Sequence, residues 1–290
     1  MTVIDGNTLD GAASVALATM KHRADLSGVS ETALLTLQAR AGEARRPDGV
    51  IDDPTAVSLV DSIDFDFAKF GHTRGQGMAL RAIGFDDHTR RYLTTHPTAT
   101  VVALAEGLQT SFYRLDASGV GKEFRWLTVD LSPIVDLRTK LLPESDRVTM
   151  LAQSALDYSW MDHVDPSHGV FITAEGLLMY LQPEEAMGLI SACAKRFPGG
   201  QMMFDLPPSW AAGLARRGTR ASRRYRMPAM PFSLSRSEAD DLVRTVPGVR
   251  AVHHVQISAG RGVVNTLVKT VQRFSRLQPL LPVWLVLEFG

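Results

Sequence analysis

The sequence lacks several features that would place the chain outside the ordinary class of globular proteins. It has a single cysteine, Cys193, so no internal disulfide can form, and the apolar run Ile190–Ala194 around it indicates a packed thiol rather than a nucleophile. No hydrophobic run is long enough to cross a bilayer, since the C-terminal stretch Leu280–Leu287 is too short. The apolar stretch Gly11–Met20 follows acidic rather than basic residues, which argues against a signal peptide. We therefore expect a cytoplasmic protein without membrane contact.

A net charge is absent as well. The 31 Lys and Arg residues balance 31 Asp and Glu residues, which argues against general nucleic-acid binding. The charge is unevenly distributed, however, because six arginines crowd the segment 216–226. This basic segment indicates either a solvated surface or a local acidic partner or substrate, and the sequence leaves both readings open.

The N-terminal third of the chain carries apolar residues at helical spacing. With 290 residues, 45% of them apolar, the chain suits one large α/β domain. The spacing predicts helices over 30–46, from Asp53-Pro54 through Val60, and over Met78–Leu93. We expect residues 1–97 to form a helical segment that contributes to a cofactor pocket.

From about residue 98, short apolar runs alternate with helical stretches such as Pro183–Arg196. The runs are Thr100–Ala105, Arg125–Val129, Val148–Leu151, Gly169–Thr173 and Gln201–Phe204. This alternation predicts a mostly parallel sheet that is covered by helices on both faces. Ligands of such sheets bind beyond the carboxyl ends of the strands, so functional residues are expected just after each run.

The last third of the chain does not continue this alternation of strands and helices. Prolines and arginines over 208–248 predict a lid inserted into a core of residues 98–290, and we interpret Asp205-Leu206-Pro207 as a bend before the lid. Two further strands are predicted, Val249–Gln256 and Val263–Val268. The C-terminal apolar run is expected to complete the sheet rather than to contact a second subunit.

The first predicted strand leads into a tight turn at Glu106-Gly107. Glycine lets a ligand approach the backbone, and Asp130 ends the next strand 23 residues later, where an acid commonly accepts hydrogen bonds from a ribose. NAD would need several glycines and a helix N-terminus for its pyrophosphate. The single glycine and the carboxylate of Glu106 instead favour a cationic sulfonium, as in S-adenosylmethionine.

Five segments follow one another in an order that resembles a known family. They are Ser27–Leu34, Asp53-Pro54, Val101–Leu115, Val129–Leu131 and Glu175–Leu181. Over roughly residues 27–206 they resemble the leucine carboxyl methyltransferase superfamily, and within it the bacterial branch of tetracenomycin-type polyketide O-methyltransferases. The resemblance implies a Rossmann-like, S-adenosylmethionine-dependent methyltransferase fold. This fold has a mostly parallel seven-stranded sheet, N-terminal helices and a helical lid insertion.

The resemblance also implies roles for individual residues. Arg81 matches the arginine that holds the methionyl carboxylate, and Glu175 matches an acid near the amino-acid end of the cofactor. Asp130 matches the ribose carboxylate, while Ala155 and Leu156 match a pair that lies against the adenine. The cofactor-binding residues implied in this way are Arg81, Ala105, Glu106, Gly107, Asp130, Ala155, Leu156 and Glu175.

Three positions depart from the family pattern. Ala105 stands where the family usually has glycine, so a positive φ at this position would strain the turn. Gln109 replaces a frequent acid, and Ala155 replaces an aspartate seen in many members. These departures predict a weakened contact with the cofactor.

The expected reaction is methyl transfer to an oxygen of a small anionic or aromatic, polyketide-like acceptor. No His or Lys in the matched segments stands out as a general base, which favours a carboxylate acceptor because it is already ionised. We expect no metal site. The expected substrate-binding residues are Tyr180 and three lid residues, Arg220, Arg224 and Tyr225, with Arg220 and Arg223 on one face of a lid helix.

Two other functions stay open at this point. One is a non-catalytic protein that binds S-adenosylmethionine or S-adenosylhomocysteine. The other is carboxyl methylation of a protein C-terminus, for which the basic segment would hold an acidic tail. The sequence does not indicate an oligomeric state.

Overall fold

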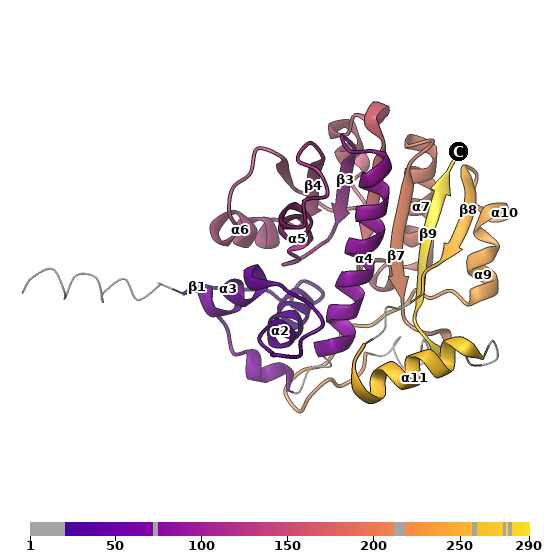
Figure 1. The fold of residues 1–290 in the computed structure, drawn as a ribbon. Coiled ribbons are helices and arrows are strands. Elements are labelled where there is room, and N and C mark those ends of the chain that lie inside the picture. The colour runs from indigo at the N-terminus through magenta and orange to yellow at the C-terminus, as the bar shows by residue number, and fades with distance from the viewer. Residues whose placement is uncertain (1–20, 72–74, 212–217, 257–259, 275–276, 278–279) are drawn as a thin grey trace, which may run out of the picture.

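A computed structural model describes residues 21–71, 75–211, 218–256, 260–274, 277 and 280–290. Its centre is a seven-stranded sheet in the order β5-β4-β3-β6-β7-β9-β8 (Figure 1). The strands are β3 (Thr100–Leu104), β4 (Arg125–Asp130), β5 (Val148–Ala152), β6 (Val170–Ala174), β7 (Gln201–Leu206), β8 (Val249–His254) and β9 (Val283–Phe289). Strands β3 to β7 are parallel to one another, whereas β9 runs antiparallel to both β7 and β8.

Helices cover both faces of this sheet. The α-helices of the described chain are α2 (Thr32–Ala44), α3 (Pro54–Ser62), α4 (Gly75–Thr95), α5 (Ser111–Ala117), α6 (Ser132–Leu141), α7 (Pro183–Arg196), α9 (Arg236–Asp240), α10 (Leu242–Thr245) and α11 (Gly262–Arg273). Helices α4 and α5 pack on one face through side chains such as Phe85 and Phe112, and α7 packs on the other through Leu189 and Ile190. The strands are therefore buried on both sides, which explains their continuous apolar character.

Helices α2 and α3 lie beyond the carboxyl ends of the parallel strands (Figure 1). Local chemistry sets the start of α3, where the Asp53 side chain accepts a hydrogen bond from the Ala56 amide and Pro54 occupies the first turn. The same segment includes two short strands, β1 (His22–Arg23) and β2 (Ile63–Asp64), and the 3₁₀ helix η1 (Phe67–Phe70). This layer forms one wall of the site described below.

Most of the predicted elements are confirmed, with two corrections. The segment Val263–Val268 was expected to be a strand, but it lies within α11, and the second C-terminal strand is β9. The predicted lid helix through Arg220 and Arg223 is wrong, because residues 218–235 contain no helix and only an isolated bridge joins Arg220 to Arg226. The part of the lid at 212–217, with two further arginines, lies outside the described residues.

Among the helices that the structure describes, none has the length and apolar character of a membrane span. The Cys193 thiol is fully buried under the sheet in α7, and burial raises its pKa, as expected of a packed thiol.

Candidate cofactor and acceptor site

A cavity of about 320 Å³ lies where α2 faces the ends of β3, β4, β5 and β6. It brings together nine residues that the sequence nominated. They are Arg81, Ala105, Glu106, Gly107, Asp130, Ala155, Leu156, Glu175 and Tyr180. The position agrees with the rule that ligands bind at the carboxyl edge of a parallel sheet.

The turn after β3 has an unusual backbone. Ala105 has a φ of 48° and Gly107 a φ of 61°, so both adopt the left-handed region. A Cβ at position 107 would lie 2.8 Å from the Cβ of Ala33 on α2, which means that glycine is needed there for space as well as for conformation. The strain anticipated at Ala105 is therefore present in the structure.

Asp130 holds this turn from the end of β4. Its carboxylate accepts hydrogen bonds from the Gly107 amide at 2.8 Å and from the Leu131 amide at 2.8 Å. Burial raises the pKa of Asp130, although the two amide hydrogen bonds act in the opposite direction. The carboxyl group is thus fixed beside the cavity, where a ribose hydroxyl can reach it.

The surroundings of Glu106 contradict the argument that its carboxylate favours a cationic ligand. Its carboxylate forms an ion pair with the buried Arg138 at 3.0 Å and accepts hydrogen bonds from Trp126 and Thr128. Arg138 also donates to the carbonyl oxygens of Gly107 and Gln109, both at 2.8 Å. Because its charge is compensated, Glu106 braces the turn rather than presenting a free carboxylate to a cationic ligand.

Arg81 on α4 forms the centre of a buried ion cluster. Its Nε donates to Glu175 Oε1 at 2.9 Å, and its Nη1 lies 3.3 Å from Asp205 Oδ2. Burial lowers the pKa of Arg81, but the charges of Asp205 and Glu175 more than compensate, so the pKa is raised and the guanidinium stays protonated. Asp205, which we had interpreted as part of a bend, is a site residue that the sequence analysis missed.

A second polar network joins this cluster to the N-terminal helices. Gln109 donates to Glu175 Oε2 at 2.7 Å and accepts from Arg114 at 3.1 Å. Arg114 in turn pairs with Asp53 and Asp86, each at 2.7 Å. The N-terminal helical segment is therefore bonded directly to the residues that line the cavity.

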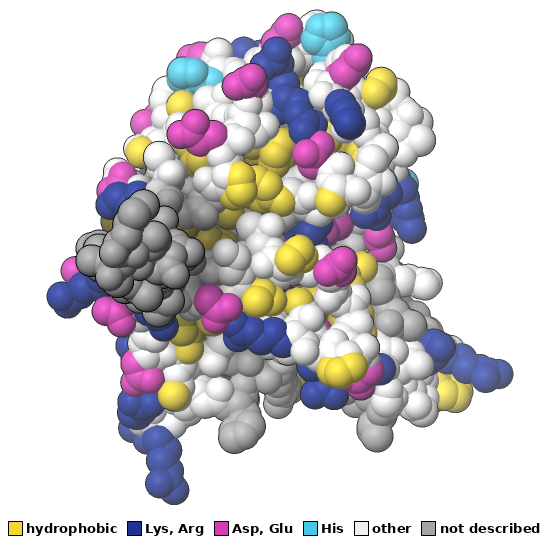
Figure 2. Space-filling model, turned by 60° about the vertical axis from the view of Figure 1, so that its left-hand side comes forward, with side chains coloured by type: hydrophobic (Ala, Val, Ile, Leu, Met, Phe, Trp, Pro, Cys, Tyr) yellow, Lys and Arg dark blue, Asp and Glu magenta, His cyan; other side chains and the backbone are white. Residues whose placement is uncertain are grey.

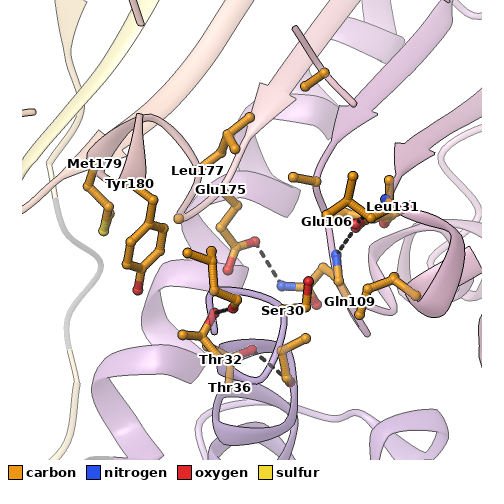
Figure 3. Close-up of a pocket in the computed structure, with 18 of the residues that line it drawn as sticks. Ser30, Thr32, Thr36, Glu106, Gln109, Leu131, Glu175, Leu177, Met179 and Tyr180 are labelled. Carbon is orange, nitrogen blue, oxygen red and sulfur yellow. Dashed lines mark hydrogen bonds between the residues drawn. The ribbon is translucent and has the colours of Figure 1, made fainter. Parts of the chain in front are cut away.

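The other end of the cavity is apolar. Figure 3 shows Met179 and Tyr180 on the side opposite Glu106 and Leu131, with Glu175 between the two ends. Burial raises the pKa of Tyr180, so its hydroxyl stays protonated at neutral pH. Met78, Leu177, Leu181, Met227 and Met230 also line the cavity.

Met227 and Met230 belong to residues 218–232, which we call the strap. The strap is fastened to the N-terminal layer: Ser222 Oγ donates to the carbonyl oxygen of Lys69 at 2.5 Å, and Arg224 pairs with Asp66 at 2.7 Å on the surface. On the face shown in Figure 2, hydrophobic side chains gather near the middle, and charged side chains lie among and around them.

The lid residues nominated as substrate contacts do not line the cavity. Arg220 is exposed, and Arg224 is more than half exposed and paired with Asp66. Tyr225 is buried against Phe70, with ring centroids 4.8 Å apart. Of the four predicted substrate-binding residues, only Tyr180 contributes to the cavity wall.

The residues present fit S-adenosylmethionine. The glycine turn leaves space that a Cβ would fill, Asp130 offers a ribose acceptor, and apolar Ala155 and Leu156 suit an adenine ring. Arg81 and Glu175 can pair with a carboxylate and an ammonium group. Within the described part of the chain, no group of three or more His, Cys, Asp or Glu residues could hold a metal ion.

Comparisons with known proteins agree with this fit. The model of the leucine carboxyl methyltransferase family matches residues 33–194. The tetracenomycin polyketide synthesis O-methyltransferase TcmP of Streptomyces glaucescens is 33% identical over 228 residues, which are 78% of this chain and 82% of the relative. The S-adenosyl-L-methionine-dependent methyltransferase dpfgK of Gibberella zeae is 27% identical over 71% of this chain and 72% of its own.

Solved structures share the fold. A candidate methyltransferase of Thermobifida fusca superposes with a TM-score of 0.54 over 98% of this chain and all of its own, at 14% identity. A DUF574 family protein of Streptomyces avermitilis has a TM-score of 0.55 over 88% of this chain and 97% of its own, also at 14% identity. These likenesses confirm the Rossmann-like methyltransferase fold.

Proposed function

Since this chain belongs to the leucine carboxyl methyltransferase family and is an S-adenosylmethionine-dependent methyltransferase, we propose that it methylates a carboxylate oxygen of a small, largely apolar acceptor. The name of the relative from Streptomyces glaucescens supports a polyketide-like acceptor. The apolar end of the cavity supports the same class of molecule, since methionine and leucine side chains adapt to flat hydrophobic bodies.

Each end of the cavity has a separate role in this proposal. Asp130 binds the ribose, while Ala155 and Leu156 contact the adenine. Arg81 and Glu175, which we call the methionyl clamp, bind the carboxylate and the ammonium group of the amino-acid end. The acceptor lies between Tyr180 and the strap residues Met227 and Met230.

The observation that carries the carboxylate proposal is the set of ionisable groups in the cavity wall. Among the described lining residues, the ionisable side chains are Arg40, Arg81, Glu106, Asp130, Glu175 and Tyr180, with no His or Lys. Glu106 and Glu175 are already paired with Arg138 and Arg81, and Asp130 with two amides. A phenol has a pKa near 10, so only about one part in 1,000 is ionised at pH 7 without a base. A carboxylate needs no base.

The chain's residues then have two tasks, alignment and exclusion of water. Bound S-adenosylmethionine supplies a methyl group on a positively charged sulfur. The acceptor oxygen forms a bond to the methyl carbon as the carbon–sulfur bond breaks, the sulfur keeps the electron pair, and no proton is released. The clamp and Asp130 fix one partner of this in-line displacement. Tyr180 and the strap cover the other.

The test is methyl transfer from a labelled donor to matched pairs of flat aromatic acids and the corresponding phenols. We expect label in the acids and its release as methanol under mild alkali, which cleaves methyl esters but not methyl ethers. Alkali-stable label on the phenols would contradict the carboxylate acceptor. Preferential labelling of a peptide C-terminus would contradict the small acceptor and support the protein-directed alternative.

A further inference from the structure

The methionyl clamp is itself held by two side chains to which the family resemblance gives no role, Asp205 and Gln109. Both are about 95% buried. Asp205 lies one residue before the end of β7, whereas Gln109 follows the glycine turn after β3, so they approach the clamp from different strands. Their contacts can therefore be tested separately.

Asp205 links the two halves of the clamp. Its Oδ1 accepts from the Gly176 amide at 2.7 Å, which fixes the turn directly after Glu175. Its Oδ2 lies 3.3 Å from Nη1 of Arg81. Gly176 has a φ of 67°, and a Cβ there would lie 3.1 Å from Nη1 of Arg81, so the turn and the guanidinium are in close contact. One carboxylate thus sets the distance between a cation and an anion that bind the same ligand.

Gln109 restrains Glu175 from the opposite side. Its Nε2 donates to Glu175 Oε2 at 2.7 Å, and Figure 3 shows the two side chains pointing toward each other. Its Oε1 accepts from the Thr110 amide at 3.0 Å and from Arg114 at 3.1 Å, which prevents the amide from turning over. Because Arg81 binds Oε1 of Glu175 and Gln109 binds Oε2, the carboxylate is held at both oxygens.

We propose that Asp205 and Gln109 are positioning residues that preorganise Arg81 and Glu175 for the amino-acid end of S-adenosylmethionine. The inference rests on the proposed role of the clamp and not on the identity of the acceptor. The charges support it, since one guanidinium and two carboxylates leave a single negative charge in the cluster. That charge suits an ammonium group, while Arg81, which uses Nε and Nη1 for its protein contacts, keeps Nη2 for the ligand carboxylate.

The test compares three ligands by titration calorimetry with the full chain. S-adenosylmethionine and S-adenosylhomocysteine carry the amino-acid end, whereas 5′-methylthioadenosine has the same adenosine and sulfur without it. The variants are Asp205→Asn, which keeps an acceptor for Gly176 but removes the charge, and Gln109→Met, which keeps the length but removes the three side-chain hydrogen bonds to Glu175, Thr110 and Arg114. We expect each to weaken the first two ligands about 10-fold and to leave 5′-methylthioadenosine within about 2-fold.

The matched control is Asp130→Asn, an equivalent change at the ribose end of the same cavity. It weakens all three ligands alike, because all three carry the ribose. Equal losses for all three ligands in the Asp205 and Gln109 variants, or no loss at all, would overturn the positioning role. Failure of the unmodified protein to bind any of the three would instead overturn the cofactor assignment. Should one variant unfold, as judged by its melting temperature, the other decides.

Discussion

Ala105 shows how one side chain can oppose the backbone conformation that its turn requires. Within the described chain it is the one non-glycine residue with a positive φ, and it lies in the turn that leaves room for the cofactor. A left-handed conformation costs a residue with a Cβ about 1–2 kcal/mol. The hydrogen bond from the Ala105 amide to the carbonyl oxygen of Val129, at 2.7 Å, holds the turn in place despite this cost.

Replacing Ala105 with glycine should therefore relieve strain. A glycine also makes the unfolded chain more flexible, which stabilises the unfolded state by about 0.4–1 kcal/mol. The relief of strain in the folded state exceeds this cost. We expect Ala105→Gly to raise the free energy of unfolding by roughly 0.5 kcal/mol in urea titrations, and not to weaken binding of S-adenosylhomocysteine. The contrasting variant is Gly107→Ala, which should cost about 2 kcal/mol because a Cβ meets Ala33 and φ is positive. A loss of more than about 1 kcal/mol in Ala105→Gly would contradict this account.

The sequence and the family resemblance nominated cofactor-binding residues that the fold brings together, and their roles stay predictions. Arg81, Gly107, Asp130 and Glu175 each follow or face a predicted strand end, and all line one cavity. Asp205 obeys the same rule, because it lies one residue before the end of β7, but the prolines that follow suggested a bend, and the sequence analysis missed this residue. The compensation of Glu106 could not be predicted, since Arg138 lies 32 positions away on α6 and only the folded packing brings the two together.

At the scale of elements, the strap connects the sheet with the N-terminal layer. Its arginines have helical spacing, but prolines at 228 and 231 and contacts with η1 and the residue before it override that tendency. The strap therefore directs Met227 and Met230 into the cavity and leaves Arg224 in solvent. Acceptor recognition through the strap is expected to be apolar rather than ionic.

Because the methionines of the strap face the cavity and Arg224 faces solvent, two alanine variants should differ in their effect on KM. Met230→Ala removes apolar contact area at the acceptor end and should raise KM for an aromatic acid about 10-fold, with cofactor affinity unchanged. Arg224→Ala breaks an exposed ion pair and should change KM by no more than about 2-fold. Steady-state kinetics with saturating cofactor measure both. A large effect of Arg224 with a small effect of Met230 would restore ionic recognition of the acceptor.

The misassigned segment 263–268 has an ambiguous pattern of apolar residues. Apolar residues at 263, 264, 267, 268 and 271 fit a helical spacing, yet the short run at 263–268 also fits a buried strand, and periodicity alone does not separate the two. The strands β3 to β7 were easier, because each contains a short, largely apolar run and helical stretches lie between the runs. Strand order was not available from the sequence, since the insertion of β9 between β7 and β8 depends on contacts distant along the chain.

For the molecule as a whole, the buried carboxyl groups of Asp130 and Asp53 change the stability of the fold in opposite directions as the pH falls. Burial raises the pKa of Asp130 above its ordinary value of about 3.9, so protonation is favoured in the folded state. Asp130 thus contributes stability below its unfolded pKa and loses that contribution as pH rises through the folded value. Burial also raises the pKa of Asp53, but Arg114 and Arg40 lower it more. The stability that Asp53 provides is therefore present above its unfolded pKa and is lost as pH falls through its lower folded value.

As the pH falls, cofactor binding should consequently weaken before the fold is lost. Protonated Asp130 accepts hydrogen bonds poorly, so affinity for S-adenosylhomocysteine should fall as pH falls through the raised pKa of this group. Calorimetry between pH 4.5 and 8, with circular dichroism on the same samples, separates the two events. The variant Asp130→Asn should bind weakly at all pH values and show a flatter profile. A loss of affinity that coincides with unfolding in both proteins would contradict this role.

The position of β9 has a consequence for how the molecule is made. Strand β8 borders only β9 in the sheet, and β7 meets β9 along its full length from Gln201 to Leu206. On the ribosome, β8 emerges before its neighbour exists, while one edge of β7 stays open. The sheet closes only when residues as far as Phe289 have left the exit tunnel, so an unfinished chain presents an open edge to which chaperones, or other nascent chains, can add a strand.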